Sequence, residues 1–152
     1  MDGSASTASF TPDGERLIVG TLDGTVEVLD SESLERQQEP IPVSPTFLAS
    51  IAISPDGALA VVQDLDTTVH LVELTGGGST SGSFPGPGFF GLPGFDPDGE
   101  VALLPGEDGS VLFDLDVDEW VRTACTRAGR ALTTEEWDRY LSSSGDYDPT
   151  CT

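Results

Sequence analysis

At 152 residues, 37% of them hydrophobic, the chain is long enough for one domain and apolar enough to bury a core. Its 27 acidic and 6 basic residues give a net charge of −21, which repels phosphate backbones and anionic lipid surfaces. We therefore expect neither nucleic acid nor membrane as a direct partner. No run approaches the roughly 18 apolar residues of a membrane span, and the N-terminus does not resemble a signal peptide, so we expect a cytoplasmic protein.

Three segments of the sequence repeat the same two turn motifs in one register. Pro12, Pro55 and Pro97 are 43 and 42 residues apart, and an aspartate that follows each of them repeats both spacings. Two motifs that hold one register predict a structural repeat. The turn residues are Pro12, Asp13, Gly14, Asp23 and Gly24 in the first repeat, Pro55, Asp56, Gly57 and Asp66 in the second, and Pro97, Asp98, Gly99, Asp108 and Gly109 in the third.

Each repeat predicts four short strands. Proline sets φ in the Pro-Asp-Gly turn, and glycine takes a conformation that other residues avoid. The apolar runs Leu17–Val19 and Leu59–Val62 predict buried strands, and Asp-Gly-Thr or Asp-Gly-Ser predicts a tight hairpin into the next strand. A fourth, weaker strand fits the remaining residues; in the second repeat it falls in the glycine-rich stretch Thr75–Gly94, where Phe89 and Phe90 are expected to fill the blade core.

Four strands in a period of about 40–45 residues are typical of a β-propeller blade. The fold class predicted is therefore all-β, a partial propeller of about three four-stranded blades, at about 1–43, 44–86 and 87–116. Closed propellers have roughly four to eight blades, so three cannot close a ring, and open blades expose strand edges. We expect that upstream blades are missing, which the immediate start in a strand favours, or that copies self-associate through the open blade edges.

Residues 117–152 predict a small helical tail. Val117–Ala128 has helical spacing and Gly129 suits its end, while Thr133–Glu136 is a capping box that begins a second helix. We expect the aromatic residues of the tail to pack its helices against the last blade; a binding surface is the alternative. These residues are Trp120, Trp137 and Tyr140.

The repeats resemble the WD40 repeats of bacterial regulators, and the tail resembles the C-terminal end of actinobacterial WD40 proteins. The tail residues that carry the likeness are Asp118-Glu119-Trp120, Ala124-Cys125, Ala128-Gly129-Arg130, Leu132-Thr133, Glu136-Trp137 and Tyr147 to Cys151. In that family the propeller follows an NTPase-type signalling module, a kinase or a DNA-binding domain. None of these precedes the blades in this sequence, so the resemblance does not carry those functions over.

The blades depart from the WD40 pattern. The Trp-Asp pair that ends a WD40 blade is replaced by Leu29-Asp30, Val72-Glu73 and, one residue early, Phe113-Asp114, and the usual Gly-His pair is absent. We therefore expect the family's network of Asp, His, Ser/Thr and Trp to be incomplete.

Candidate site residues are few, and no catalytic, cofactor or metal residue is predicted. His70 is the one histidine; it aligns with Glu27 at a variable strand position, so we expect it to face solvent. Asp96–Gly99 is similar to a calcium loop, but the other repeats identify it as a blade turn. The acidic run Asp114–Glu119 suits a helix N-terminus.

Cys125 and Cys151 are the only cysteines and have no histidine neighbours, which argues against a zinc site. Because both belong to the tail pattern, the resemblance implies that they lie close together. A reducing cytoplasm favours two thiols, and a disulfide stays open as the alternative.

We therefore predict a non-catalytic scaffold or sensor module of a bacterial regulatory protein. This module is expected to bind other proteins and to have no cofactor. The alternative is a propeller enzyme such as a lactonase or a quinoprotein-like dehydrogenase, which would need inward-facing histidines, arginines or carboxylates. With one histidine and only Arg16 and Arg36 in the blades, that supply is small. A third possibility is a non-functional fragment of a longer propeller.

Overall fold

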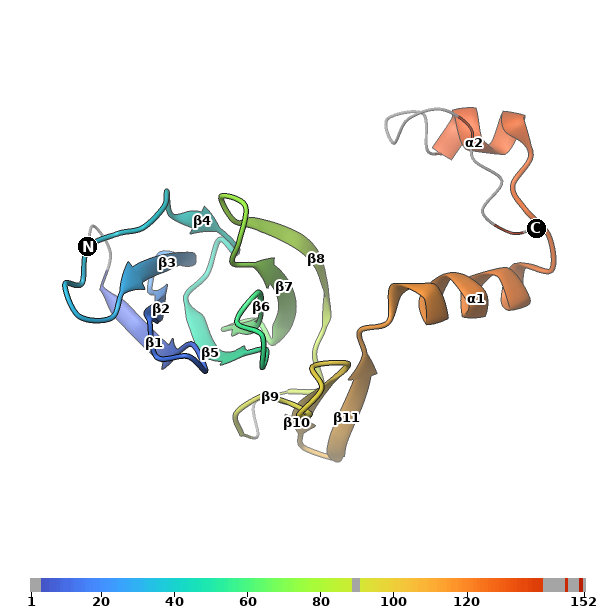
Figure 1. The fold of residues 1–152 in the computed structure, drawn as a ribbon. Coiled ribbons are helices and arrows are strands. Elements are labelled where there is room, and N and C mark those ends of the chain that lie inside the picture. Colours follow the sequence, from blue (N-terminus) through green and yellow to red (C-terminus); the bar gives the residue numbers. More distant parts are fainter. Residues whose placement is uncertain (1–3, 89–90, 141–146, 148–150, 152) are drawn as a thin grey trace. The chain divides into compact units, whose positions relative to one another are not determined.

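The computed structural model describes residues 4–88, 91–140, 147 and 151, and divides the chain into two compact units, Met1–Leu115 and Asp116–Thr152 (Figure 1). The first unit is all-β, with three antiparallel sheets that correspond to the three predicted blades. Phe89 and Phe90 lie outside the described residues. None of the described helices is long and apolar enough to cross a membrane.

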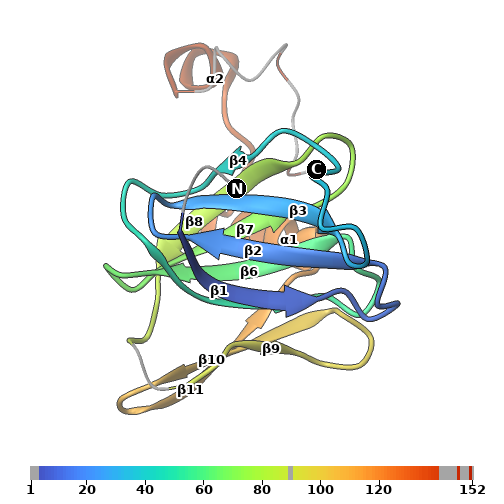
Figure 2. The same cartoon turned by 90° about the vertical axis from the view of Figure 1, so that its left-hand side faces the viewer.

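The first blade has the strand order β1-β2-β3-β4, and the second has β5-β6-β7-β8. The third has the order β11-β10-β9 in the described part of the chain. The strands are β1 Ala5–Phe10, β2 Arg16–Thr21, β3 Thr25–Asp30, β4 Ile41–Pro42, β5 Leu48–Ile53, β6 Leu59–Asp64, β7 Thr68–Glu73, β8 Ser79–Pro85, β9 Gly94–Phe95, β10 Val101–Gly106 and β11 Gly109–Asp114. The glycine-rich stretch therefore supplies β8, in the place predicted for a fourth strand. Figure 2 shows β1, β2 and β3 side by side in the first blade.

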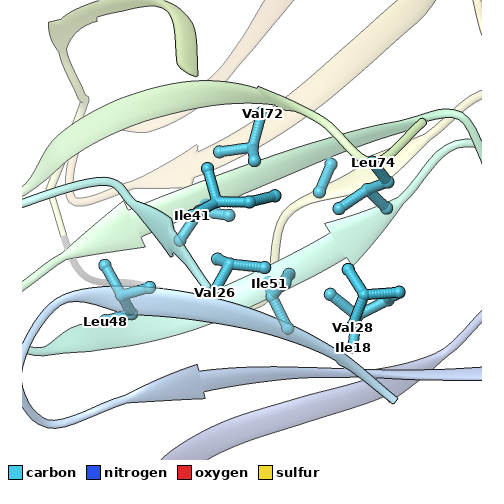
Figure 3. Close-up of a cluster of buried hydrophobic side chains, with 10 residues drawn as sticks. Ile18, Val26, Val28, Ile41, Leu48, Ile51, Val72 and Leu74 are labelled. Carbon is cyan, nitrogen blue, oxygen red and sulfur yellow. The ribbon is translucent and has the colours of Figure 1, made fainter. Parts of the chain in front are cut away.

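The hydrophobic core lies between the blades, because neighbouring blades pack face to face (Figure 3). Ile18, Val26 and Val28 of the first blade meet Ala60, Val62 and Val72 of the second. The alternate residues Val61, Val69 and Leu71 meet Ala102 and Leu104 of the third. Since successive side chains in a strand point to opposite faces, β6 and β7 are buried on both sides. The first strands of the blades, β1, β5 and β9, lie next to one another, as the inner strands of a propeller do.

The Pro-Asp-Gly motifs form the same turn in all three blades. In the first, Thr11 Oγ1 donates to Asp13 Oδ1 at 2.6 Å, and in the second Ser54 Oγ donates to Asp56 Oδ1 at the same distance. These hydroxyl donors, above all, lower the pKa of Asp13 and of Asp56. In the third blade Asp96 takes the place of the hydroxyl residue and accepts from the backbone N–H of Val101 at 2.9 Å. The three turn glycines have φ of 75°, 71° and 76°.

The second turn motif does not form the same hairpin in every blade. Three residues separate β2 from β3 and β6 from β7, and Gly24 or Thr67 takes the positive φ there. Only Glu107 and Asp108 separate β10 from β11, and Gly109 is already the first residue of β11. The repeat pattern predicted equivalent hairpins. Shortening the third by one residue shifts the register of β11 by one, which turns each of its side chains to the opposite face.

The tail unit contains two helices, α1 Val117–Ala128 and α2 Thr134–Tyr140. Asp116 from the acidic run caps α1, since its side chain accepts from the backbone N–H groups of Asp118 and Glu119. Gly129 ends α1 in the left-handed conformation, at φ 69°. The predicted capping box forms before α2, in that Thr133 and Glu136 exchange side chain to backbone hydrogen bonds.

Candidate functional site

His70, the residue on which a catalytic reading would depend, lies inside the blade unit. Its exposed fraction is 7%, so the prediction that it faces solvent is wrong. His70 pairs across the sheet with Val62, whose side chain faces the first blade. The prediction treated the position as variable because Glu27 aligns with it, but the second blade has a neighbouring blade on each side, so both faces of β7 are covered.

Asp64 is the centre of a buried polar cluster with His70 and Ser44, which we call the blade clip. His70 Nε2 lies 3.0 Å from Asp64 Oδ2, and Ser44 Oγ donates to the same oxygen at 2.7 Å. The backbone N–H of Thr68 donates to Asp64 Oδ1 at 2.9 Å. Burial raises the pKa of Asp64, but the hydrogen bonds from His70, Ser44 and Thr68 together outweigh burial and hold this pKa below its usual value.

The blade clip connects two blades through the chain segment between them. Ser44 lies between β4 and β5, and its backbone N–H donates to the carbonyl of Gly24, in the hairpin of the first blade, at 3.0 Å. A continuous path of hydrogen bonds therefore runs from that hairpin through Ser44 to Asp64 in the second blade. Sequence reasoning missed this cluster; the signal was the aspartate that ends β6, which stands where the first blade has Thr21.

The hydrogen bonds of the blade clip differ from those of a Ser-His-Asp triad. In a triad the histidine stands between the serine and the carboxylate. Here Ser44 and His70 both approach the same Asp64 oxygen, and the described residues include no hydrogen bond between Ser44 and His70. An aspartate, a histidine and a serine thus meet in the second blade, with the histidine supplied by β7.

The same strand position in the first blade holds Glu27, which is also buried, with an exposed fraction of 2%. Arg36 Nη2 lies 2.6 Å from Glu27 Oε1, while Glu27 Oε2 is buried without a hydrogen-bond partner among the described residues. Arg16, the other arginine of the blades, donates to the carbonyl oxygens of Gly57 at 2.8 Å and of Leu74 at 3.4 Å. Arg16 therefore connects the first blade to the second, whereas Arg36 binds within the first blade.

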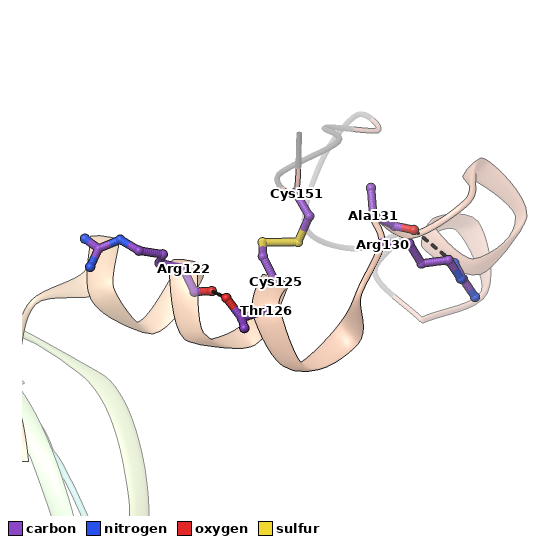
Figure 4. The surroundings of a disulfide bond; sticks show 6 residues. All are labelled: Arg122, Cys125, Thr126, Arg130, Ala131 and Cys151. Atoms are coloured by element: carbon purple, nitrogen blue, oxygen red, sulfur yellow. Dashed lines mark hydrogen bonds between the residues drawn. A yellow bond between two sulfur atoms is a disulfide. The ribbon is translucent and has the colours of Figure 1, made fainter.

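The tail contains a disulfide between Cys125 at the end of α1 and Cys151 (Figure 4). The sequence left open whether these residues are two thiols or a disulfide, and in the structure they form the disulfide. The Trp137 ring meets the Tyr147 ring edge to face, with centroids 5.9 Å apart, and Tyr147 Oη donates to the carbonyl of Leu132 at 2.8 Å. Contacts within the tail thus hold Trp137 beside Tyr147.

The other tail residues are more exposed. The Arg130 guanidinium binds both carboxylate oxygens of Glu136 at 2.7 Å and, as the main cause, lowers the pKa of Glu136 to about 2. Trp120 and Tyr140 are exposed. That the tail aromatics pack against the last blade stays a prediction.

Replacing Asp64 by Asn should lower the free energy of unfolding by about 1–3 kcal/mol at neutral pH, because Asn accepts weaker hydrogen bonds than a carboxylate. The pKa of Asp64 is lowered in the fold, so the carboxylate stabilises the protein above its unfolded pKa of about 3.9, and this contribution is lost as the pH falls through the lowered value. Urea unfolding of wild type and Asp64→Asn between neutral and strongly acidic pH checks this.

Asp66→Asn is the matched control, since Asp66 is an exposed aspartate in the same hairpin and should unfold like wild type. A stability gap between wild type and Asp64→Asn that persists unchanged into strong acid would contradict the assigned role of the Asp64 carboxylate.

The three antiparallel sheets define the first unit as a partial, propeller-like all-β fold. No family model and no curated protein matches the sequence. Among solved structures, the chain is similar to the hydrazine synthase of Kuenenia stuttgartiensis, a protein that contains a β-propeller, with a TM-score of 0.65 and 17% identity. The match covers 76% of this chain and 34% of that one. At this identity the likeness shows the fold alone, and this chain spans about a third of the length of the enzyme it matches.

Proposed function

We propose that the chain is a non-catalytic scaffold or sensor module that binds other proteins through the hairpin turns at one end of its blades. The observation that carries the proposal is a repeated exposed leucine. Leu22 and Leu65 occupy equivalent places in the β2–β3 and β6–β7 hairpins and have exposed fractions of 54% and 47%. Asp23 and Asp66 follow them directly. Because neighbouring blades repeat one topology, both hairpins lie at the same end of the blades.

The chemistry of this surface indicates the kind of partner. Exposed leucines provide apolar contact, and the adjacent carboxylates, in a chain of net charge −21, favour a basic partner. Loops on a rigid scaffold are common binding sites. A protein segment that combines apolar and basic residues fits both features.

The polar residues of the blades support a non-catalytic role over the enzyme alternative. His70 is bound to Asp64, and Arg16 and Arg36 bind groups within the blades. The resemblance of the tail to actinobacterial WD40 proteins supports a place in a bacterial, cytoplasmic signalling protein. A non-functional fragment of a longer propeller, the third possibility, would differ from a scaffold or sensor module because it would bind no partner selectively.

Selection of random peptides displayed on phage against the immobilised protein tests this function. We expect enriched peptides that combine apolar and basic residues, whose binding weakens as salt concentration rises. The double substitution Leu22→Asp and Leu65→Asp should abolish the binding, whereas Leu34→Asp, at an exposed leucine in the loop after β3, should not. Equal binding by the two variants would contradict the assigned surface. Hydrolysis of a lactone, or quinone-dependent oxidation of a substrate, by the wild type would favour the enzyme alternative.

A further inference from the structure

The disulfide of the tail lies in the wall of an open cavity. Cys125 and Cys151 are both half-buried, and both line this cavity, which has a volume of about 490 Å³. A volume of this size falls within the range of roughly 300–1,000 Å³ that small-molecule sites have. Because exchange requires a thiolate to approach a sulfur atom directly, an accessible disulfide reacts more readily than a buried one. A small solute that enters the cavity therefore reaches a reactive bond.

The charged residues that line this cavity are two arginines and one aspartate, namely Arg122, Arg130 and Asp118. Glu119 and Glu136 form ion pairs with these arginines but do not line the cavity. A positive balance is unusual in a chain of net charge −21. The open cavity beside the first Pro-Asp-Gly turn is lined instead by four acidic residues and one basic residue, which are Asp13, Glu15, Asp30, Glu32 and Arg16. The lining of the disulfide cavity thus favours an anionic ligand.

Both arginines of the cavity retain donors for a carboxylate. A guanidinium has five N–H donors. Among the described contacts, Arg122 gives one of them to Glu119, and Arg130 gives two to Glu136 and one to Ala131. Figure 4 shows both guanidinium groups pointing away from the disulfide, so binding requires a change of rotamer. Exposed side chains such as these change rotamer within nanoseconds.

We propose that this cavity is a thiol–disulfide exchange site for a small thiol that carries a carboxylate group. Arg122 and Cys125 are three residues apart on α1, so they share a face of the helix. A carboxylate bound by Arg122 therefore brings the thiol beside Cys125. The thiol loses its proton to water, and its sulfur attacks Cys125 Sγ. A bond forms between these two sulfurs, the bond to Cys151 breaks, and Cys151 leaves as a thiolate that takes up a proton.

The position of Cys125 in the helix makes Cys151 the better leaving group. Cys125 lies in the last turn of α1, where the backbone carbonyls disfavour a negative charge, whereas Cys151 lies outside both helices. The more stable thiolate leaves faster. A second thiol then attacks the sulfur of the first, which yields the small disulfide and a thiol at Cys125. In sum, two small thiols are oxidised to one disulfide and the Cys125–Cys151 bond is reduced. The site consists of tail residues alone and does not rest on the proposed function.

Exchange rates with three thiols of similar size and different charge test the site. The oxidised protein, in which iodoacetamide modifies neither cysteine, is mixed with mercaptoacetate, mercaptoethanol or cysteamine, and mass spectrometry follows the product. Each rate is divided by that thiol's rate with a small uncharged disulfide, which removes its intrinsic reactivity. We expect the anionic mercaptoacetate to react about tenfold faster than the neutral mercaptoethanol. The net charge of −21 by itself would produce the reverse order.

Two double variants assign this preference to the cavity. Arg122→Gln with Arg130→Gln should abolish the advantage of mercaptoacetate and leave the rate of mercaptoethanol unchanged. Arg127→Gln with Arg139→Gln removes the same charge from tail residues that do not line the cavity, and should keep the advantage. Circular dichroism of the oxidised variants establishes that both are folded.

Trypsin separates the two cysteines and identifies the sulfur that is attacked. Cleavage after the arginines places Cys125 in the peptide 123–127 and Cys151 in the peptide 140–152. When wild-type exchange is quenched early with acid, the adduct should lie on Cys125.

Three results would overturn the proposal. Alkylation of both cysteines without a reductant would show that the disulfide is not formed. An adduct found mainly on Cys151, or one that forms only in denaturant, would exclude the attack on Cys125 within the folded tail. A mercaptoacetate rate below that of mercaptoethanol, or an advantage that Arg122→Gln with Arg130→Gln leaves intact, would exclude the anionic thiol.

Discussion

Reduction of the Cys125–Cys151 disulfide should melt the tail while the blades stay folded. The tail is a compact unit of its own, and its second helix, α2, has no buried residue. A unit this small buries too little apolar surface to stay folded without a cross-link. The disulfide spans a sequence separation of 26 and encloses α2. In the chain-entropy model, closing such a loop is worth about 3–4 kcal/mol, which is a large share of the stability of a unit this size.

Backbone hydrogen exchange, with and without a reductant, measures this effect for the two units separately. Reduced protein, or the double variant Cys125→Ser and Cys151→Ser, should lose protection throughout α2 and keep it in β2, β3, β6 and β7. Arg130→Gln is a suitable comparison, because it removes the exposed ion pair with Glu136 and the hydrogen bond to the carbonyl of Ala131 but leaves the disulfide in place, and it should have a smaller effect. Unchanged protection of α2 after reduction would show that other contacts hold the tail.

Gly24→Ala should prevent stable folding of the first blade. A Cβ at Gly24 would lie 1.9 Å from the carbonyl oxygen of Ser44 and 2.6 Å from that of Thr46, and both are backbone atoms. The positive φ of 82° adds strain of about 1–2 kcal/mol. The segment between β4 and β5 must therefore move away from the β2–β3 hairpin. This movement breaks the hydrogen bonds from the backbone N–H groups of Val43 and Ser44 to the carbonyl of Gly24. We expect a loss above about 4 kcal/mol, at the extreme of single substitutions.

Gly14→Ala separates the two contributions. Gly14 has a similar φ of 75°, but a Cβ there would meet no atom within 4 Å. Its cost should therefore be the backbone strain alone, about 1–2 kcal/mol. Urea unfolding curves of both variants give the comparison. Similar losses of stability would mean that the segment between β4 and β5 moves to accommodate the Cβ of Gly24→Ala with little loss of free energy.

The repeat was enough to predict three sheets, because Pro-Asp-Gly has one preferred local geometry and needs no tertiary context to form it. The environment of His70 was not predictable in the same way. Whether a strand has one solvated face depends on how many neighbours its sheet has, and that number is a property of the assembled blades. The blade clip escaped prediction for a related reason, since Ser44 reaches Asp64 from the segment between two blades.

Whether the two cysteines form a disulfide could not be predicted from the sequence. Their place in one tail pattern implied proximity, but the choice between thiols and a disulfide depends on the redox environment as well as on distance. The third hairpin shows another limit. Asp108 and Gly109 match Asp23 and Gly24 in sequence, yet the loop has one residue fewer, and residue type alone does not fix loop length.

The short third hairpin also means that the blades are not interchangeable parts. Because β3 and β7 keep the same offset from their partner strands, exchanging one for the other preserves which residues point inward. The Asp-Gly motif aligns Leu71 with Phe113, but in the structure Leu112 takes the place of Leu71, because Leu112 pairs with Leu103 as Leu71 pairs with Val61. If β7 replaced β11 according to the sequence alignment, Val69 and Leu71 would point to the wrong side of the third sheet. A consensus sequence built by aligning the three repeats would contain this error in β11 alone.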